Sequence, residues 1–365
     1  MEKERVQLFP DELPSGKRFK IKRRSKERRR ALVSLFCCVV IFALGFALSD
    51  AIRNGTIKLP SFLNVQHVRP SSTTSTTAEP SDDPPETLAP SIEELYEFDY
   101  SLIEAGEIAV IPLDLSVSEY GDTYIYNDTA YNPDLEGLLE KNSFLPAFSE
   151  SDEPLVLIIH THTTESYTEE GKLSYSENEE YARSQNEEEN VVAVGKVIAD
   201  ILNENGIKTL HSTVFHDLES YRDSYARSAE TVKYYLEKYP SIKYVFDIHR
   251  DSIIRSTGEI VRPVTIAEDE VTAQIMCVVG TDQVMEREYG WENNLALALA
   301  IRSSMNEKYG NMVRGTCLRE SSYNQELAPV SLLFEIGAGG NYLSEAKTAA
   351  KLLAEELADI IKNSN

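Results

Sequence analysis

The chain has 365 residues but only four cysteines, and two of these, Cys37 and Cys38, fall in an apolar segment near the start. The remainder holds only Cys277 and Cys317, with no CxxC pair. This scarcity excludes a small scaffold held together by disulfides. A bridge between Cys277 and Cys317 can be drawn, but two unpaired, buried thiols are the preferred interpretation. Neither has an obvious base, which disfavours a thiol nucleophile.

Positive charge is scarce beyond the first 30 residues. The net charge is 36 − 60 = −24, while residues 1–30 hold 12 Lys or Arg and 5 Asp or Glu, or +7. The other 335 residues therefore carry −24 − 7 = −31. An acidic body argues against a nucleic acid partner, because phosphate binding needs a basic surface. A phosphate-binding loop is also missing, since GAGGN at 337–341 matches neither glycine-rich pattern.

Long apolar runs are missing except for one, at residues 31–48, which reads ALVSLFCCVVIFALGFAL. Eighteen residues rise about 27 Å as a helix, close to the thickness of a bilayer core. The basic cluster before this run predicts a cytoplasmic N-terminus and an extracytoplasmic body. A cleaved signal peptide is the alternative, but the charged region is long and no convincing cleavage site follows. We therefore predict a single transmembrane signal anchor.

Composition divides the rest of the chain into three parts. Residues 49–93, with the stretch SSTTSTTAEPSDDPPETLAPS, are too polar and proline-rich to fold and are predicted to be a disordered linker. Residues 94–145 are too short for a core of their own and are predicted to be an N-terminal extension packed on the next domain. Residues 146–365 are predicted to be the catalytic domain.

Strand and helix patterns alternate through this last domain. Apolar runs predict buried strands, and apolar residues at helical spacing predict the helices between them. The expected strands are 155–159, 207–214, 243–249 and 329–337, with a further strand at 108–117 and a hairpin at 259–280; the expected helices are 191–205, 224–239, 291–310 and 344–363. This order predicts an α/β fold with a mainly parallel, twisted sheet and helices on both faces.

Three of the expected buried strands end in side chains that can bind a metal or move a proton. In chain order they are His160, His162 and Glu165; Asp247, His249, Arg250 and Asp251; and Glu335. Strand alternation would point His160 and His162 to the same side. The carboxyl ends of parallel strands are where α/β sheets bind ligands. His211 and His216 lie near another strand end and are predicted to be surface or loop residues.

Imidazole and carboxylate ligands without thiolates suit zinc, with three protein ligands and one open position. Zinc in such a site activates water and polarises a carbonyl. Glu335 lies within an apolar strand, where an unpaired carboxylate is costly, so it fits a general acid or base. Asp247 and Asp251 could orient a ligand imidazole, and Arg250 could bind a substrate carboxylate. Each motif alone is more often structural, but all three on one sheet edge predict a functional site.

At these residues the chain resembles the stage II sporulation protein P family of endospore-forming bacteria. The resemblance covers about residues 150–365, and its motifs agree in order and spacing. They are IIHTHTTESY (158–167), NVVAVG (190–195), FDIHRDS (246–252), YNQEL (323–327) and LLFEIG (332–337). The single membrane anchor followed by a polar spacer agrees as well.

The resemblance implies a zinc-amidase-like fold and a zinc-dependent N-acetylmuramoyl-L-alanine amidase activity on peptidoglycan. The family is also associated with cleavage of peptide cross-links. These activities imply a role in endospore engulfment, with the catalytic domain in the intermembrane space of the sporangium. Stage II sporulation proteins D and M are the implied partners.

The same resemblance implies a set of metal ligands. His249 is expected on the metal together with His160 or His162. Since the choice between His160 and His162 is open, both are kept as predicted ligands. Related amidases take a glutamate at the start of the first helix, where Glu188 is the best match. Glu165, three residues after His162, is nevertheless the preferred third ligand, with Glu188 in reserve. The usual Gly-His-Gly-Gly motif is replaced here by HTHTTE, which leaves these alternatives open.

Glu335 is the implied catalytic carboxylate. Asn324 and Gln325, within YNQEL, are predicted with Arg250 to bind substrate. Two other functions compete with the amidase. One is a different metallopeptidase, of the carboxypeptidase or poly-γ-glutamate hydrolase type, in which Arg250 would hold a terminal carboxylate. The other is a non-enzymatic scaffold that binds the cell wall or partner proteins.

Overall fold

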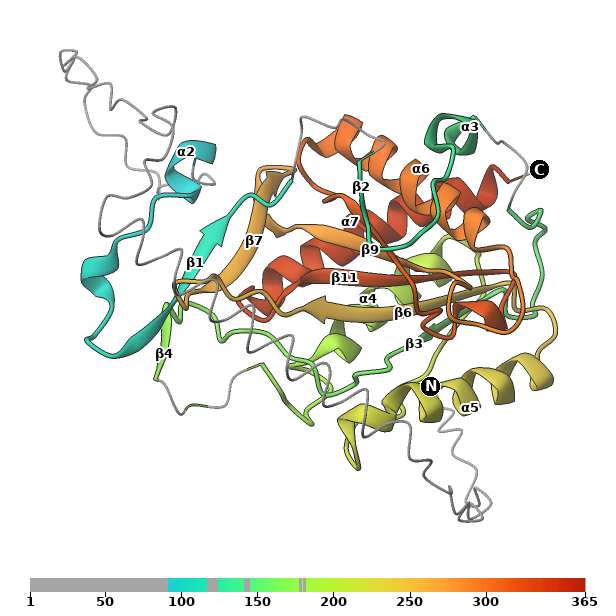
Figure 1. Ribbon diagram of the computed structural model, residues 1–365, viewed down its shortest axis with the longest axis horizontal. Helices are drawn as coiled ribbons and strands as arrows, with labels where there is room; N and C mark the ends of the chain where they lie inside the picture. The colour runs from blue at the N-terminus through green and yellow to red at the C-terminus, as the bar shows by residue number, and fades with distance from the viewer. Residues whose placement is uncertain (1–90, 117–123, 141–144, 177–178, 180–181, 365) are drawn as a thin grey trace, which may run out of the picture. The chain divides into compact units, whose positions relative to one another are not determined.

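The computed structural model describes residues 91–116, 124–140, 145–176, 179 and 182–364 (Figure 1). The predicted basic tail, the predicted transmembrane segment and nearly all of the predicted linker lie outside these residues. Within the described ranges, no helix has both the length and the apolar character that a membrane span requires.

A seven-stranded sheet forms the centre of the fold, in the order β2-β10-β9-β11-β6-β3-β5. Its strands are β2 (Ile125–Asn127), β3 (Val156–Ile159), β5 (Thr209–His211), β6 (Tyr244–Asp251), β9 (Ile275–Gly280), β10 (Thr316–Arg319) and β11 (Val330–Ala338). Neighbouring strands run parallel except β9 and β11, which are antiparallel. The predicted α/β class with a mainly parallel sheet is therefore confirmed.

A smaller sheet has the order β4-β1-β7-β8. Its strands are β1 (Glu107–Leu113), β4 (Ser174–Ser176), β7 (Ile260–Ala267) and β8 (Glu270–Ala273). The strand predicted at 108–117 is thus present as β1, which pairs with β7, while β2 pairs with β10. The predicted hairpin at 259–280 is correct for β7 and β8 but wrong for β9, because the chain changes sheets at Gln274.

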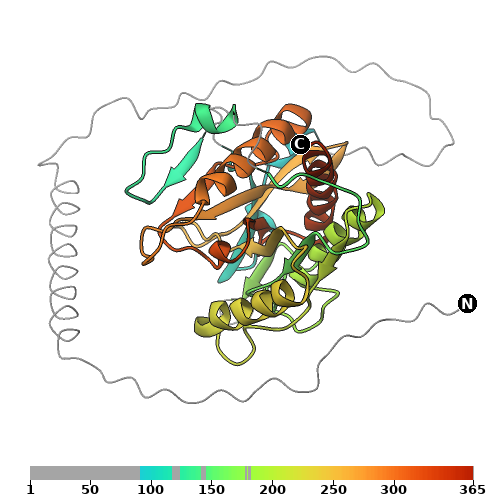
Figure 2. The ribbon, with the colours of Figure 1, turned by 90° about the vertical axis from the view of Figure 1, so that its right-hand side faces the viewer.

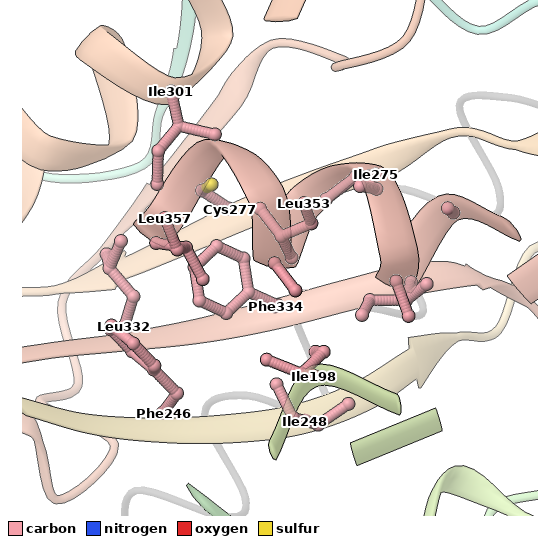
Figure 3. Packing of buried hydrophobic residues seen from close by; sticks show 14 of the residues in the cluster. Ile198, Phe246, Ile248, Ile275, Cys277, Ile301, Leu332, Phe334, Leu353 and Leu357 are labelled. Carbon is pink, nitrogen blue, oxygen red and sulfur yellow. The ribbon is translucent and has the colours of Figure 1, made fainter. Parts of the chain in front are cut away.

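Helices cover both faces of the larger sheet. Its helices are α4 (Val191–Glu204), α5 (Ser224–Lys238), α6 (Trp291–Tyr309) and α7 (Leu343–Lys362), with the short α2 (Ile92–Leu95) and α3 (Leu135–Leu139) outside. The main core joins one sheet face to α4, α6 and α7, and a smaller core joins β3 and β6 to α5 (Figure 2). Figure 3 shows Phe334 of β11 beside Leu353 and Leu357 of α7 in the main core.

The α5 side of the sheet is only partly covered. Met276, Val278, Cys317 and Leu333 form a small apolar cluster there, with Tyr323 packed against it and no helix residue in it. Cys277 lies in the main core instead, since side chains alternate between the two faces of a strand. Both cysteines are free and buried, as expected, and they lie on opposite sides of the sheet. This apolar cluster on β9, β10 and β11 borders the site described next.

Candidate metal centre

Three side chains predicted as metal ligands meet at the carboxyl ends of β3 and β6. His162, Glu165 and His249 each place one ligand atom within 4.8 Å of the others, and all three are buried. His162 Nδ1 lies 3.4 Å from Glu165 Oε1, and His249 Nδ1 lies 3.1 Å from Glu165 Oε2. One carboxylate thus stands between two imidazoles.

The local chain explains how they meet. β3 ends at Ile159, and the turn that follows is closed by a hydrogen bond of 3.0 Å from the Glu165 N–H to the His162 carbonyl. This bond puts the two side chains three residues apart on one turn. β6 runs parallel to β3 with Asp247 opposite Ile159, so His249 emerges just beyond the end of β3. The rings of His162 and His249 are 5.0 Å apart and nearly perpendicular.

This donor set fits zinc. With bonds of about 2.0–2.1 Å, two neighbouring ligand atoms of a tetrahedral zinc site are about 3.3–3.4 Å apart. Each histidine lies near that distance from a different oxygen of Glu165, and one ligand atom from each of the three residues lies within 4.8 Å of the others. The other ring nitrogen of His249 faces Asp247 Oδ1 at 3.0 Å, although not aligned as a hydrogen bond. Asp247 in turn accepts hydrogen bonds from the N–H and hydroxyl of Thr161, at 2.8 and 2.6 Å. A carboxylate held behind a ligand histidine is the usual support of a zinc site.

Charges within the cluster compensate one another. Burial alone would raise the pKa of Glu165, but the charge of His249 and hydrogen bonds from both histidines hold it well below its usual value. Burial would also lower the pKa of His249, but Asp247 and Glu165 raise it well above the ordinary histidine value. A metal ion bound here would replace the proton of His249 as the balancing positive charge.

Glu335 lies beside the cluster, on β11, directly opposite His249 of β6. Its side chain is half-buried, and its Oε2 has no hydrogen-bond partner in the described part of the chain. Burial raises the pKa of Glu335 to about 8; the charge of His249 opposes this rise, while Asp251 and Glu165 add to it. A carboxyl group that holds a proton near neutral pH suits a general acid or base.

His160 does not reach the cluster, although it was predicted as a ligand. Its Nδ1 lies 2.9 Å from the Ile248 carbonyl and its Nε2 lies 2.8 Å from His211 Nε2. Burial lowers the pKa of His160 to about 4, so the ring is neutral. The alternation that would align His160 with His162 fails, because the strand ends at Ile159 and a turn follows.

The prediction that His211 and His216 are surface or loop residues is only partly right, because His216 lies in the loop after β5 but is buried, while His211 is the last residue of β5. His211 contacts His160 as described, and His216 is only 1% exposed. The Nδ1 of His216 lies 2.7 Å from the His160 carbonyl, and its Nε2 lies 2.9 Å from Thr231 Oγ1. These imidazoles brace the turn that carries His162. Glu188, the reserve ligand, is exposed just before α4 and lies outside the cluster.

Gly195 makes room for the pair of histidines beneath α4. A Cβ at this position would lie 2.6 Å from His160 Cε1 and 2.9 Å from His211 Nε2. We expect Gly195→Ala to lower the free energy of unfolding by about 1–3 kcal/mol, the usual cost of overpacking. Urea denaturation would measure this loss. Alanine ordinarily stabilises a helix relative to glycine by roughly 1 kcal/mol, so an equally stable or more stable variant would contradict the prediction.

The predicted substrate-binding residues are tied to the protein itself. The guanidinium of Arg250 donates to the carbonyls of Ser166, Ala182 and Asp251, at 3.1, 2.7 and 3.1 Å. Arg250 thereby fixes the loop beside the cluster, although its side chain still borders the pocket.

Asn324 and Gln325 hold the loop after β10. Asn324 Nδ2 donates to the Tyr225 carbonyl at 2.8 Å, while Gln325 Nε2 donates to the Val278 carbonyl at 2.9 Å. The Gly280 N–H donates back to Gln325 Oε1 at 3.0 Å. The structure therefore directs both amides into the fold, where they position Tyr323 at the pocket.

Tyrosines beside the cluster were not predicted from the sequence. The ring of Tyr221 stacks on His162, with centroids 4.1 Å apart and planes at 19°. Tyr225 meets His162 edge-on at 5.5 Å and contacts Tyr323 at the same distance. No pattern in the sequence singled them out, since Tyr221 precedes the helix predicted at 224–239 and Tyr225 is the second residue of that helix.

Comparisons with known proteins give one family and several structures. Residues 117–358 match the family model described as stage II sporulation protein P. A protein of that name from Bacillus subtilis (strain 168) is 29% identical over 229 residues, which are 59% of this chain and 53% of that protein. The chain thus spans about half the length of this relative.

Among solved structures, the CwlD amidase from Clostridioides difficile in complex with the GerS lipoprotein is 13% identical and has a TM-score of 0.35, covering 58% of this chain and 95% of that one. An N-acetylmuramoyl-L-alanine amidase from Clostridium difficile 630 is 15% identical, with a TM-score of 0.33 and coverage of 58% and 96%. TM-scores this low do not establish a shared fold.

Proposed function

The chain belongs to the stage II sporulation protein P family, and from this premise we propose that it is a membrane-anchored, zinc-dependent N-acetylmuramoyl-L-alanine amidase. Its substrate would be peptidoglycan, cut during endospore engulfment in the intermembrane space of the sporangium. The observation that carries the proposal is the cluster of His162, Glu165 and His249 with Glu335 beside it. Two imidazoles, one carboxylate and a separate protonatable carboxyl group are what a hydrolytic zinc site needs.

In this proposal His162, Glu165 and His249 hold the zinc ion. When bound, zinc supplies a Lewis acid for the amide carbonyl and lowers the pKa of water. Beside a bound cation Glu335 would be ionised, so it could accept a proton from the attacking water and deliver it to the leaving nitrogen. The water oxygen bonds to the lactyl carbonyl carbon of muramic acid, the C–N bond breaks, and L-alanine leaves with a free amine. Asp247 keeps the imidazole of His249 in the orientation that binding requires.

The size of the pocket suits an enzyme that acts on an extended polymer. The cluster lies in a pocket of about 420 Å³ on the α5 side of the sheet. A membrane anchor would raise the local concentration of the enzyme at the wall, which an acidic body does not attract over long range. The proposal includes the stage II sporulation proteins D and M as partners, on family membership alone.

Product analysis tests the proposed function. The full chain, supplied with zinc, would be incubated with purified peptidoglycan, and soluble products would be identified by mass spectrometry. We expect stem peptides that begin with a free L-alanine amine, and glycan that keeps its lactyl groups. Shortened stem peptides still attached to muramic acid would favour the metallopeptidase. Wall binding without any product would favour the scaffold.

A further inference from the structure

The pocket at the metal centre continues onto the face of β9 and β11 that carries the small apolar cluster. Its floor beyond Glu335 is apolar and consists of Met276, Val278 and Leu333. Glu335 of β11 lies opposite Met276 of β9. Leu333 lies opposite Val278, two residues further along the same two strands. The floor therefore begins next to the proposed catalytic carboxylate.

One wall of this extension is rigid. Tyr323 and Asn324 both have left-handed backbone conformations, with φ of 55° and 62°, which are uncommon for residues other than glycine. The hydrogen bonds of Asn324 and Gln325 hold this turn against α5 and β9. Strain that the surrounding structure maintains is typical of residues placed for function. Here it presents the ring of Tyr323 to the pocket.

Cationic side chains line this pocket although the body of the chain is acidic, with a net charge of −31 over residues 31–365. They are Arg222, Arg250 and Arg319, and they stand beside the carboxyl groups of Glu165, Asp251 and Glu335. Arg250 is occupied by backbone carbonyls. Arg319 is 40% exposed and forms an ion pair with Asp128, which is 57% exposed. Exposed pairs contribute roughly 0–1 kcal/mol, so an incoming carboxylate can compete for Arg319 at little cost.

The distance from the metal centre to Arg319 matches a short peptide. β6, β11, β9 and β10 are successive neighbours, so β10 lies three strand spacings, about 14 Å, from the strand that carries His249. Arg319 ends β10 with its long side chain at the pocket. An extended peptide rises about 3.3 Å per residue, so two residues beyond the reacting amide cover about 7 Å, and the side chains of Arg319 and of the second residue would have to span the rest.

We propose that the peptide part of the substrate lies across β11, β9 and β10, with the first alanine methyl on the floor of Met276, Val278 and Leu333 and a carboxylate of the following residue paired with Arg319. This inference rests on the proposed function, and it adds that the site selects a substrate with a negative charge on the second residue of the peptide. Guanidinium and carboxylate form charge-assisted hydrogen bonds, which are about twice as strong as neutral ones. A neutral carboxamide at the same place cannot form them.

Binding of two probes to the zinc-loaded full chain tests the inference. The probes are the dipeptide of L-alanine and D-glutamate with its γ-carboxyl converted to a carboxamide, and its counterpart with both carboxyls converted, measured by isothermal titration calorimetry. We expect the carboxylate probe to bind about tenfold more tightly. Arg319→Gln should remove this preference, whereas Arg255→Gln, which changes an exposed arginine outside the pocket, should keep it.

Asp128→Asn separates substrate binding from a structural role of the ion pair. If Arg319 anchors a carboxylate, freeing it from Asp128 should tighten binding of the carboxylate probe. If the ion pair only holds the fold, both variants should weaken both probes, and the inference is overturned. Equal affinity of the wild-type chain for the two probes would overturn it as well. Because binding is measured without turnover, a chain that prefers the carboxylate but releases no stem peptide would refute only the proposed amidase.

Discussion

Replacing Glu335 with glutamine is expected to lower kcat by about 10²- to 10⁴-fold while the bound zinc is retained, since that is the usual contribution of a general acid or base. Glutamine keeps the size of the side chain but cannot accept and return a proton. Glu335 is not among the three clustered ligand residues, so the metal content should stay unchanged. Turnover of a muramoyl peptide and zinc content by atomic absorption would be measured on the same sample.

The matched control for this variant is Glu320→Gln, because Glu320 is an exposed glutamate on the loop after β10 and does not line the pocket. It should keep wild-type turnover. A second readout follows from the raised pKa of Glu335, about 8. The folded chain holds this proton through a range in which the unfolded chain has lost it, so the group makes stability fall as pH rises from about 4.5 to 8.

Glu335→Gln removes this titration. In the chelator-treated chain, the variant should therefore gain stability relative to wild type as pH rises through the same range. Full turnover by Glu335→Gln, or loss of turnover together with loss of zinc, would refute the assigned role.

Sequence patterns were sufficient to predict the site residues that lie on strands, because a strand determines where its side chains point. His249 and Glu335 were predicted because each interrupts a buried apolar run, and parallel strands bring their carboxyl ends to one edge. The register that places Glu335 directly opposite His249 was not predictable, since pairing depends on contacts between strands far apart in the sequence. The antiparallel insertion of β9 beside β11 was missed for the same reason.

Side chains beyond the strand ends were harder to place. The choice between His160 and His162 depends on a turn, in which the two-residue alternation no longer applies. Asn324 and Gln325 were predicted to face substrate, but a polar side chain can equally satisfy buried backbone groups, and only tertiary structure decides. Tyr221 belongs to a short 3₁₀ turn, Tyr221–Asp223, so no periodicity brought it next to His162.

Replacing His249 with alanine is expected to reduce the zinc content from about one ion per chain to near zero and to abolish turnover, because two remaining protein ligands do not hold a zinc site. The metal-free variant should also be less stable than the metal-free wild type by about 3–5 kcal/mol, the usual result of removing one partner from a buried ion pair. Asp247 and Glu165 would both lose the positive charge that they face in the metal-free chain. Zinc content and urea denaturation, each measured before and after chelation, would test both effects.

Three further variants, compared with His249→Ala, turn this measurement into a test of the ligand set. His160→Gln should keep zinc even if it weakens the fold, since both ring nitrogens of His160 contact Ile248 and His211 rather than the cluster. Glu165→Gln should lose zinc, while Glu188→Gln should keep it, because Glu188 is exposed and outside the cluster. A folded His160→Gln chain without zinc, or a Glu165→Gln chain with full zinc, would show that the metal is held by different residues. In the proposed site the turn after β3 and strand β6 would hold the ion, so only variants at those ligands should separate zinc loss from unfolding.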